Sequence, residues 1–394
     1  MSRFHSHITS ASKIIGTYVA GKPLSIHIKN FFASDKKFGS RDRRSISSLC
    51  YYYFRTGLPF KQAGAEEKIL AGLFLCENKH NELLHYFRPD LNEKISISTD
   101  EKLSFLNIKE TDIFPFTDEL GEGIDKHFFS LSFLLQPAIY LRTRAGRKNI
   151  VVDKLTHAAA DFELLSGDCI KLANSIAIDK IIALNKDAVV QDMNSQKVLD
   201  YLDAMPGFSS TEKKITAWDC CAASGGKSIL LFDKLKGNIR LTVSDIRENI
   251  LINLRKRLGQ AAINIANSFI TDLSVKSGLA ATERFSVIIC DVPCTGSGTW
   301  SRTPEQLFFF DRKKISEYAD LQKKIVANAV PHLEENGLFF YITCSAFKKE
   351  NEEVVEFINK KFPSMQLMNA HYLKGYEDSA DTMFVAVFRR SSMA

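Results

Sequence analysis

The stretch ITAWDCCAASGGKSILLFDKL, residues 215–235, shows where a parallel sheet begins. A short apolar run passes through small residues and the pair Gly225-Gly226 into an amphipathic helical pattern. The same alternation recurs to the end of the chain, with predicted strands ITAWD (215–219), IRLTVSD (239–245), FSVIICD (285–291) and GLFFYIT (337–343). Such an alternation is typical of a mostly parallel, doubly wound sheet buried on both faces. We therefore predict an α/β domain over residues 211–394.

The chain before this domain divides into two further parts. Residues 1–130 are predicted to be mainly helical, because apolar positions recur at helical spacing between Gly, Pro and Asp breakers. Residues 131–210 are predicted to form a small α/β segment, from the β-prone runs PAIYLRTR, KNIVVDKL, CIKLANS and AIDKIIAL. An amphipathic helix is predicted over 188–205, and the turn-rich PGFSSTEKK, residues 206–214, leads into the last domain.

The composition is that of a soluble globular protein, with 45% hydrophobic and 25% charged residues in 394. No apolar run approaches the roughly 20 residues that span a bilayer, so we expect no membrane association. The N-terminus lacks a secretory signal and the eight cysteines are scattered along the chain. We therefore expect a cytoplasmic protein.

Basic residues are concentrated at the N-terminal end. Residues 1–60 carry ten Lys or Arg residues against two Asp, while the net charge of the whole chain is +6. This distribution suits the phosphates of a nucleic acid, and it equally suits a solvated basic face. The candidate RNA contacts are Arg41, Arg43, Arg44 and Arg302, with Arg142, Arg144 and Arg147 as further candidates for phosphate contact.

The loop at 221–227 is a candidate cofactor site, because small residues between a strand and a helix let a ligand approach the backbone. A phosphate-binding P-loop is excluded because Cys221 stands where its first glycine is required. Asp245 ends the next predicted strand, where an acid can accept the hydroxyls of a ribose, or can cap a helix. Asp272 is similarly placed to reach an adenine amino group, or to cap a helix.

Two cysteines differ from the others because they leave strands at the same expected edge of the sheet. Asp291 and Cys294 follow one strand in DVPCTGSGT, and Cys344 follows another between Thr343 and Ser345. Thiols near strand ends and helix starts can ionise and react. We predict inert, buried thiols at Cys50, Cys76, Cys169, Cys220 and Cys290. No C-x-x-C pair occurs, so we expect no structural zinc and no other metal.

Together these segments resemble the Sun/Fmu family of RNA 5-methylcytosine methyltransferases. The resemblance rests on CAASGGK at 221–227, Asp245, Asp272, DVPCTGSGT at 291–299, Arg302-Thr303-Pro304, Leu321-Gln322, and TCS with Glu350-Asn351-Glu352. It implies a Rossmann-like class I methyltransferase domain, S-adenosyl-L-methionine as cofactor and RNA as partner, with ribosomal RNA favoured over transfer RNA. SRDRRSISSLCYYYFR looks like part of the NusB-like helical domain that some members carry, and we expect a monomer.

The resemblance also implies roles for individual residues. Cys344 would be the nucleophile, and Cys294 would assist breakdown of the covalent adduct and release of the product. Asp291 would lie between the cofactor and the target base. The implied cofactor contacts are Cys221, Ala222, Ala223, Ser224, Gly225, Gly226, Lys227, Asp245, Asp272 and Asp291; Ser224 stands where the family usually has proline.

Two other classes of function stay open from the sequence. A Cys-dependent hydrolase or transferase would pair Cys344 with His332 or His371 and would need no S-adenosylmethionine. A ribosome-binding assembly factor that has lost catalysis would bind RNA without needing Cys344.

Overall fold

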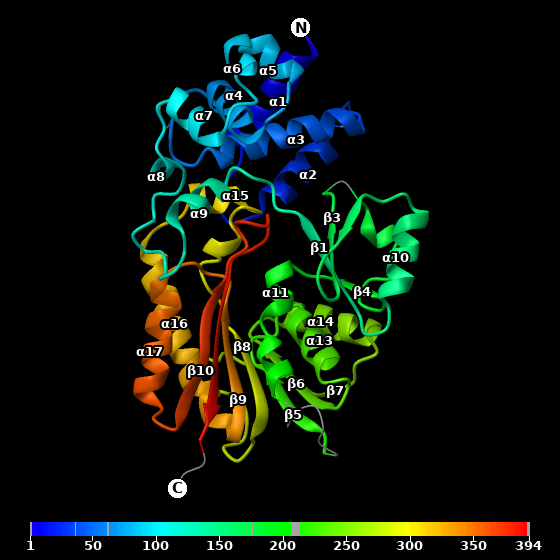
Figure 1. Cartoon of the computed structure of the whole chain (residues 1–394), viewed down its shortest axis with the longest axis vertical. Coiled ribbons are helices and arrows are strands. Elements are labelled where there is room, and N and C mark those ends of the chain that lie inside the picture. Colours follow the sequence, from blue (N-terminus) through cyan, green and yellow to red (C-terminus); the bar gives the residue numbers. More distant parts are fainter. Residues whose placement is uncertain (1, 36, 61–62, 175, 206–212, 392–394) are drawn as a thin grey trace. The chain divides into compact units, whose positions relative to one another are not determined.

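The computed structural model describes the whole chain except residues 1, 36, 61–62, 175, 206–212 and 392–394, and it divides into two compact units (Figure 1). The first unit comprises Met1–Leu120, Asp125–Pro137 and Thr299–Arg312. The second comprises Gly121–Ile124, Ala138–Gly298 and Lys313–Ala394. Thr299–Arg312 therefore belongs to the first unit, although it lies within the domain predicted over residues 211–394.

The first unit is helical, which confirms the prediction for the N-terminal region. Its helices are α1 (Arg3–Gly16), α2 (Leu24–Ser34), α3 (Ser40–Arg55), α4 (Ala65–Cys76), α5 (Glu82–Phe87), α6 (Pro89–Glu93), α7 (Thr99–Phe105), α8 (Glu110–Ile113), α9 (Lys126–Ser132) and α15 (Pro304–Phe308). Helices α3 and α4 come into close contact at Gly72, where a Cβ atom would lie 2.2 Å from the carbonyl oxygen of Tyr52. A larger residue at this position would force the two helices apart.

The second unit is built on a seven-stranded sheet with the order β10-β11-β9-β8-β5-β6-β7. Its parallel strands are β5 (Ile215–Asp219), β6 (Ile239–Asp245), β7 (Ile265–Ile270), β8 (Phe285–Asp291) and β9 (Leu333–Thr343). The two strands β11 (Met383–Arg390) and β10 (Met365–Leu373) extend the sheet in the antiparallel sense. This mostly parallel sheet confirms the predicted Rossmann-like fold.

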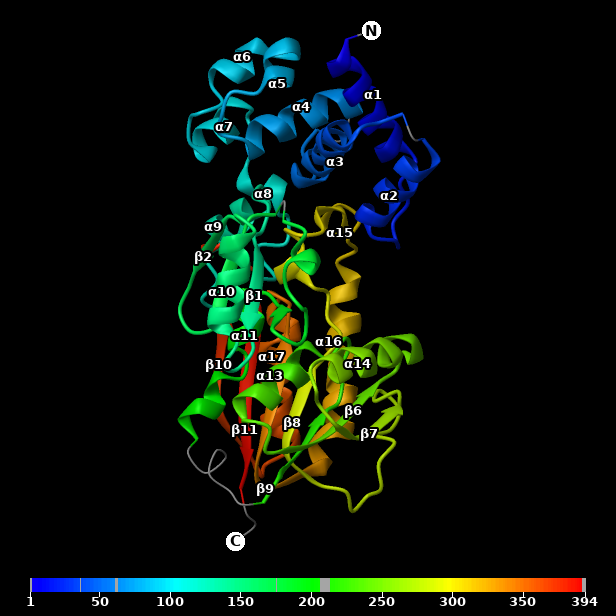
Figure 2. The same ribbon diagram turned by 90° about the vertical axis from the view of Figure 1, so that its right-hand side faces the viewer.

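Helices cover both faces of this sheet (Figures 1 and 2). Helices α13 (Gly226–Lys234) and α14 (Glu248–Gln260) cover one face, and α16 (Lys313–Ala329) and α17 (Glu352–Lys361) cover the other. Along β8, Ile289 packs into the first core, while Ile288 and Cys290 pack into the second. Because successive side chains point to opposite faces, both must be apolar, and this explains the continuous apolar run of the sequence.

A four-stranded antiparallel sheet precedes the large one, with the order β2-β3-β1-β4. Its strands are β1 (Ile139–Thr143), β2 (Phe162–Leu164), β3 (Cys169–Leu172) and β4 (Ala188–Val190). The β-prone prediction for KNIVVDKL was wrong, because these residues begin helix α10 (Lys148–His157). Val151 and Leu155, four residues apart, are both fully buried, so the helical period explains their burial.

Two further sequence predictions in this region were wrong. AIDKIIAL forms no strand and contains the short 3₁₀ helix Ile178–Lys180. The single helix predicted over 188–205 is broken, because Ala188–Val190 pairs with β1 as strand β4. Helix α11 (Met193–Lys197) begins only after Asp192, whose side chain accepts from the Asn194 amide, and a 3₁₀ helix follows at Asp200–Ala204. The predicted joint at 206–214 lies mostly outside the described residues.

Candidate active site

Three neighbouring strands of the large sheet bring the predicted site residues to one edge. Strands β5, β8 and β9 are parallel, so their carboxyl ends lie at the same edge. Asp291, the last residue of β8, is the register partner of Ile342, and the Val292 amide donates to the Ile342 carbonyl at 3.1 Å. The loops that carry Cys294 and Cys344 therefore leave the sheet side by side.

The thiols of Cys294 and Cys344 are in contact, with 3.3 Å between their sulfur atoms. Both side chains are partly exposed. The pKa of Cys294 is raised well above its ordinary value, first by the hydrogen bond with Cys344, then by burial and by the charges of Cys344 and Glu350. The thiol of Cys294 therefore stays protonated at neutral pH.

Backbone hydrogen bonds fix the position of the Cys344 loop. The amide of Gly298 donates to the carbonyl of Cys344 at 2.9 Å, and the amide of Thr382 donates to the carbonyl of Gly298 at 2.9 Å. A Cβ atom on Gly298 would lie only 2.0 Å from the Thr382 carbonyl oxygen. Only glycine therefore fits between the backbone segments at Cys344 and Thr382.

Lys227 and Asp291 form an ion pair, with 2.6 Å between Nζ and Oδ2. Burial acts to lower the pKa of Lys227, but the charge and hydrogen bond of Asp291 outweigh it and the pKa is raised. The lysine is therefore a permanent cation, and it also interacts electrostatically with Cys344.

The predicted cofactor loop has the backbone conformation that small residues permit. Ala223 has φ 44° and Gly225 has φ 82°, and a Cβ atom on Gly225 would lie 3.2 Å from Leu254 Cγ. The Ala223 amide donates to Asp245 Oδ2 at 3.0 Å, which ties the loop to the end of β6. Ser224 accepts from Arg257 Nη1 through its carbonyl oxygen at 2.9 Å and its hydroxyl oxygen at 2.7 Å. Cys221 and Ala222 lie between β5 and this turn.

The two predicted acids beyond this loop differ in environment. Asp245 is 5% exposed and accepts from the amide and guanidinium groups of Arg247 as well as from Ala223. Its pKa is lowered, because these hydrogen bonds outweigh the opposing effect of burial. Asp272 is exposed after β7, and its Oδ1 accepts from the amide and hydroxyl of Ser274. Asp272 therefore begins the turn at residues 273–275 and does not cap a helix, the alternative that the sequence left open.

Asp219, the last residue of β5, is a candidate that the sequence analysis missed. It is 1% exposed, and burial raises its pKa to about 7. One carboxylate oxygen accepts from the Ser228 hydroxyl at 2.6 Å, whereas the other has no hydrogen-bond partner among the described residues. A buried acceptor without a partner beside a positive-φ loop fits a ligand that carries a donor or a positive charge. The only signal in the sequence was an acid between the first strand and the small-residue loop.

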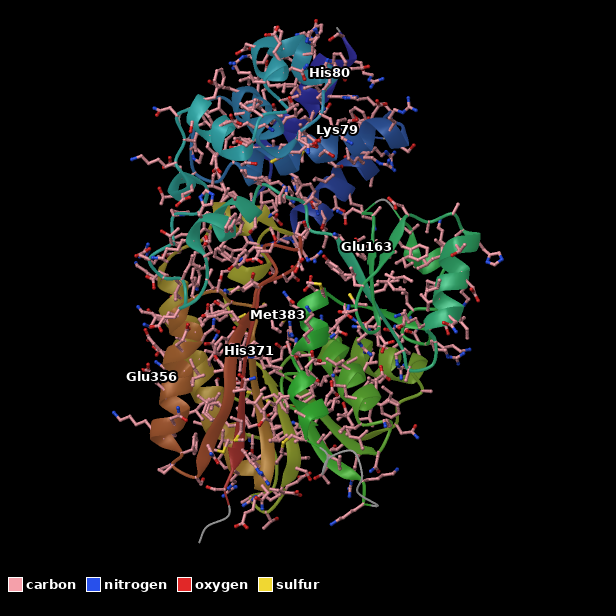
Figure 3. All side chains as sticks on the ribbon, viewed as in Figure 1. Lys79, His80, Glu163, Glu356, His371 and Met383 are labelled. Atoms are coloured by element: carbon pink, nitrogen blue, oxygen red, sulfur yellow. The ribbon has the colours of Figure 1, made fainter. Side chains whose placement is uncertain are left out.

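Neither histidine of the hydrolase hypothesis lies beside Cys344. His332 precedes β9 at its opposite end, and its Nδ1 lies 2.9 Å from the Glu283 carbonyl oxygen. His371 lies on β10 and pairs with Val385 of β11, two strands away from β9 (Figure 3). Within the described part of the chain, no histidine is within hydrogen-bonding distance of Cys344. The hydrolase hypothesis therefore lacks its base.

The arginines predicted to contact phosphate fall into different groups. Arg142 and Arg144 are 5% and 8% exposed and both pair with Asp233, so the prediction that they contact phosphate was wrong. Arg147 remains partly exposed near Asp187. In the first unit, Arg41 and Arg44 are exposed, whereas Arg43 donates from Nε to the Phe38 carbonyl at 2.9 Å. Arg302, partly exposed, also belongs to the first unit.

The described residues lack two kinds of feature. They contain no group of three or more His, Cys, Asp or Glu side chains that could hold a metal ion. None of their helices combines the length and the apolar character that crossing a bilayer requires.

Comparison with known proteins identifies relatives of the second unit. Residues 209–388 match the family model of the 16S rRNA methyltransferase RsmB/F, which confirms the resemblance to the Sun/Fmu family. A probable ribosomal RNA small subunit methyltransferase B of Bacillus subtilis is 25% identical over 202 residues, and a ribosomal RNA small subunit methyltransferase B of Yersinia pseudotuberculosis is 28% identical over 205. Each match covers 51% of this chain and less than half of the relative, 44% and 45%.

Solved structures share the fold at low identity. The crystal structure of PH0851 is similar over 99% of both chains, with a TM-score of 0.73 at 17% identity. The crystal structure of NSun6 from Pyrococcus horikoshii with SFG covers 71% of this chain and 97% of its own, with a TM-score of 0.60 at 12% identity. At identities this low, the likeness shows a shared fold and nothing more.

Proposed function

We propose that the chain methylates carbon 5 of a cytosine in RNA with S-adenosyl-L-methionine as methyl donor, since residues 209–388 match the RsmB/F methyltransferase family model. The observation that carries the proposal is the contact between two thiols at the sheet edge that also bears the cofactor loop. Ribosomal RNA is the favoured substrate, since the matching relatives are named for it. Transfer RNA is the alternative.

The loop at 221–227 and the acids around it supply the groups that S-adenosylmethionine requires. The unpartnered oxygen of Asp219 is an acceptor for an ammonium or amide donor, and Asp245 is an acceptor for ribose hydroxyls. Asp272, which follows β7, would accept from the adenine amino group. When bound, the cofactor supplies an electrophilic methyl group.

Cys344 is the nucleophile in this proposal. Carbon 5 of cytosine is a poor nucleophile, so the thiolate of Cys344 first adds to carbon 6 and makes carbon 5 electron-rich. The ammonium group of Lys227 interacts electrostatically with this residue. Asp291 contacts the ring near nitrogen 3, where charge develops, and Lys227 fixes the position of its carboxyl group.

Cys294 acts when the adduct breaks down. A base, here solvent water, takes the carbon-5 proton; the electron pair of that C–H bond restores the double bond between carbons 5 and 6, and the bond between carbon 6 and sulfur breaks. The thiol of Cys294 is protonated and hydrogen-bonded to Cys344, so it can donate its proton to the departing sulfur. The buried thiols of Cys220 and Cys290 take no part.

The target base must leave its stack to reach the thiols. This costs roughly a few kcal/mol in a duplex and less in a loop or single strand. An accessible cytosine in ribosomal RNA, met during assembly of the subunit, is therefore the favoured substrate.

The test is methyl transfer from labelled S-adenosylmethionine to small-subunit ribosomal RNA, with bisulfite sequencing of the product. We expect 5-methylcytosine with the unaltered protein and none with Cys344→Ala. Cys76→Ala, in the first unit, is the control and should remain active. RNA binding without any methylation by the unaltered protein would contradict the proposal and favour the catalytically silent assembly factor.

A further inference from the structure

Glu350 is a fully buried acid next to the thiol pair, with 0% of its surface exposed. Its Oε1 accepts from the Thr295 amide at 2.9 Å and from the Gln322 side-chain amide at 2.9 Å. Its Oε2 accepts from the hydroxyls of Thr295 and Ser345, both at 2.5 Å. One carboxylate therefore receives four hydrogen bonds.

The donors come from both loops that carry a thiol. Thr295 directly follows Cys294, and Ser345 directly follows Cys344. Gln322 also donates to the carbonyl of Pro293 at 3.1 Å, immediately before Cys294. The carboxylate thus holds the backbone around Cys294, directly at Thr295 and through Gln322 at Pro293. It also holds Ser345, the residue that follows Cys344.

All four hydrogen bonds, from three residues, are donated to the Glu350 carboxylate, and this bears on its charge. The pKa of Glu350 is raised above its ordinary value by burial, and the hydrogen bonds from Ser345, Thr295 and Gln322 oppose this effect. A protonated carboxyl would turn one acceptor into a donor that faces other donors, so the ionised form suits the site. Its charge also raises the pKa of Cys294.

We propose that Glu350 is a positioning residue, which sets the separation of the Cys294 and Cys344 thiols and places a buried carboxylate beside Cys294. This inference rests on the proposed function, in which Cys344 must add to the base while Cys294 stays protonated. The charge of Glu350 acts on Cys294, whose loop it also holds.

The test variant is Glu350→Gln, which keeps the shape and places an amide N–H₂ group where one oxygen accepted two donors. The matched control is Glu356→Gln, on the exposed side of α17 (Figure 3). Circular dichroism establishes that both variants are folded. If Glu350→Gln fails to fold, Thr295→Val replaces it, because it removes one hydroxyl donor to the carboxylate and retains the backbone amide.

The first readout is the equilibrium between the dithiol and the Cys294–Cys344 disulfide in buffers of reduced and oxidised glutathione, measured by mass spectrometry. Because correct placement of two groups is worth orders of magnitude in effective concentration, we expect the equilibrium constant for the disulfide to fall roughly 10- to 100-fold in Glu350→Gln. Glu356→Gln should match the unaltered protein. Equal constants in Glu350→Gln and the unaltered protein would overturn the positioning role.

The second readout is the pH dependence of alkylation of Cys294 by iodoacetamide, measured for each cysteine by peptide mapping. Loss of the Glu350 charge should move the Cys294 profile to lower pH, which a purely structural role would not do. An unmoved profile would overturn the electrostatic part of the proposal. Neither readout uses RNA or cofactor, so a failure of the proposed function, seen in the methylation assay, is distinguishable from a failure of this one.

Discussion

Gly298→Ala tests the contacts that hold the Cys344 loop. The new Cβ atom would lie 2.0 Å from the Thr382 carbonyl oxygen, 2.9 Å from the Thr382 carbonyl carbon and 3.0 Å from the Cys344 carbonyl oxygen. All three are backbone atoms, so no flexible side chain can relieve the clash. Overpacking of this kind costs about 1–3 kcal/mol, and each lost hydrogen bond costs about 1 kcal/mol more.

We therefore expect the free energy of unfolding of Gly298→Ala to fall by about 2–4 kcal/mol, measured by urea denaturation followed by circular dichroism. A shift of Cys344 by about 1 Å would reduce the rate of methyl transfer roughly 100-fold. The control is Gly259→Ala in α14, where no atom lies within 4 Å of the new Cβ. It should be as active as the unaltered protein and equally or more stable. Unchanged stability and activity in Gly298→Ala would refute the described packing of this loop.

Three further predictions concern other parts of the chain. Because burial raises the pKa of Asp219 to about 7, its contribution to stability is full below the ordinary pKa of an aspartate and is lost as the pH rises through 7. Between pH 5 and 8, the unfolding free energy of Asp219→Asn, measured by urea denaturation, should fall less than that of the unaltered protein. An equal fall in both proteins would contradict this. Asp233→Ala leaves two buried arginines uncompensated and should cost about 3–5 kcal/mol in urea denaturation, whereas a loss below 1 kcal/mol would contradict the buried pairing. Replacing Arg41 and Arg44 by glutamine should weaken RNA binding and reduce its salt dependence in filter-binding titrations; unchanged affinity would exclude them as contacts.

The sequence predicted the large sheet well because its strands are buried on both faces. The predicted bounds of β5, β6 and β8 agree with the structure residue for residue. The prediction failed for residues 148–155 and 188–205, where short apolar runs fit a strand and a helix equally well. Pairing of Ala188–Val190 with β1 decided the second case, and such pairing depends on a strand distant in the sequence.

The meeting of Cys294 and Cys344 could be predicted, because the carboxyl ends of adjacent parallel strands share an edge. The importance of Asp219 and Glu350 could not be predicted from their positions alone. The environment of Glu350 depends on donors from three separate segments, and that of Asp219 on burial. The burial of Arg142 was similarly hidden, because Asp233, its partner, is distant in the sequence.

The most direct test of the account uses Cys294→Ala, in which the adduct between protein and RNA should persist. The adduct is digested with trypsin and ribonuclease, and mass spectrometry identifies the residue that carries the nucleotide. We predict a methylated cytidine bound to the peptide that contains Cys344. A nucleotide on any other residue, or an adduct that still forms when Cys344 is also replaced by alanine, would contradict the assignment of the nucleophile.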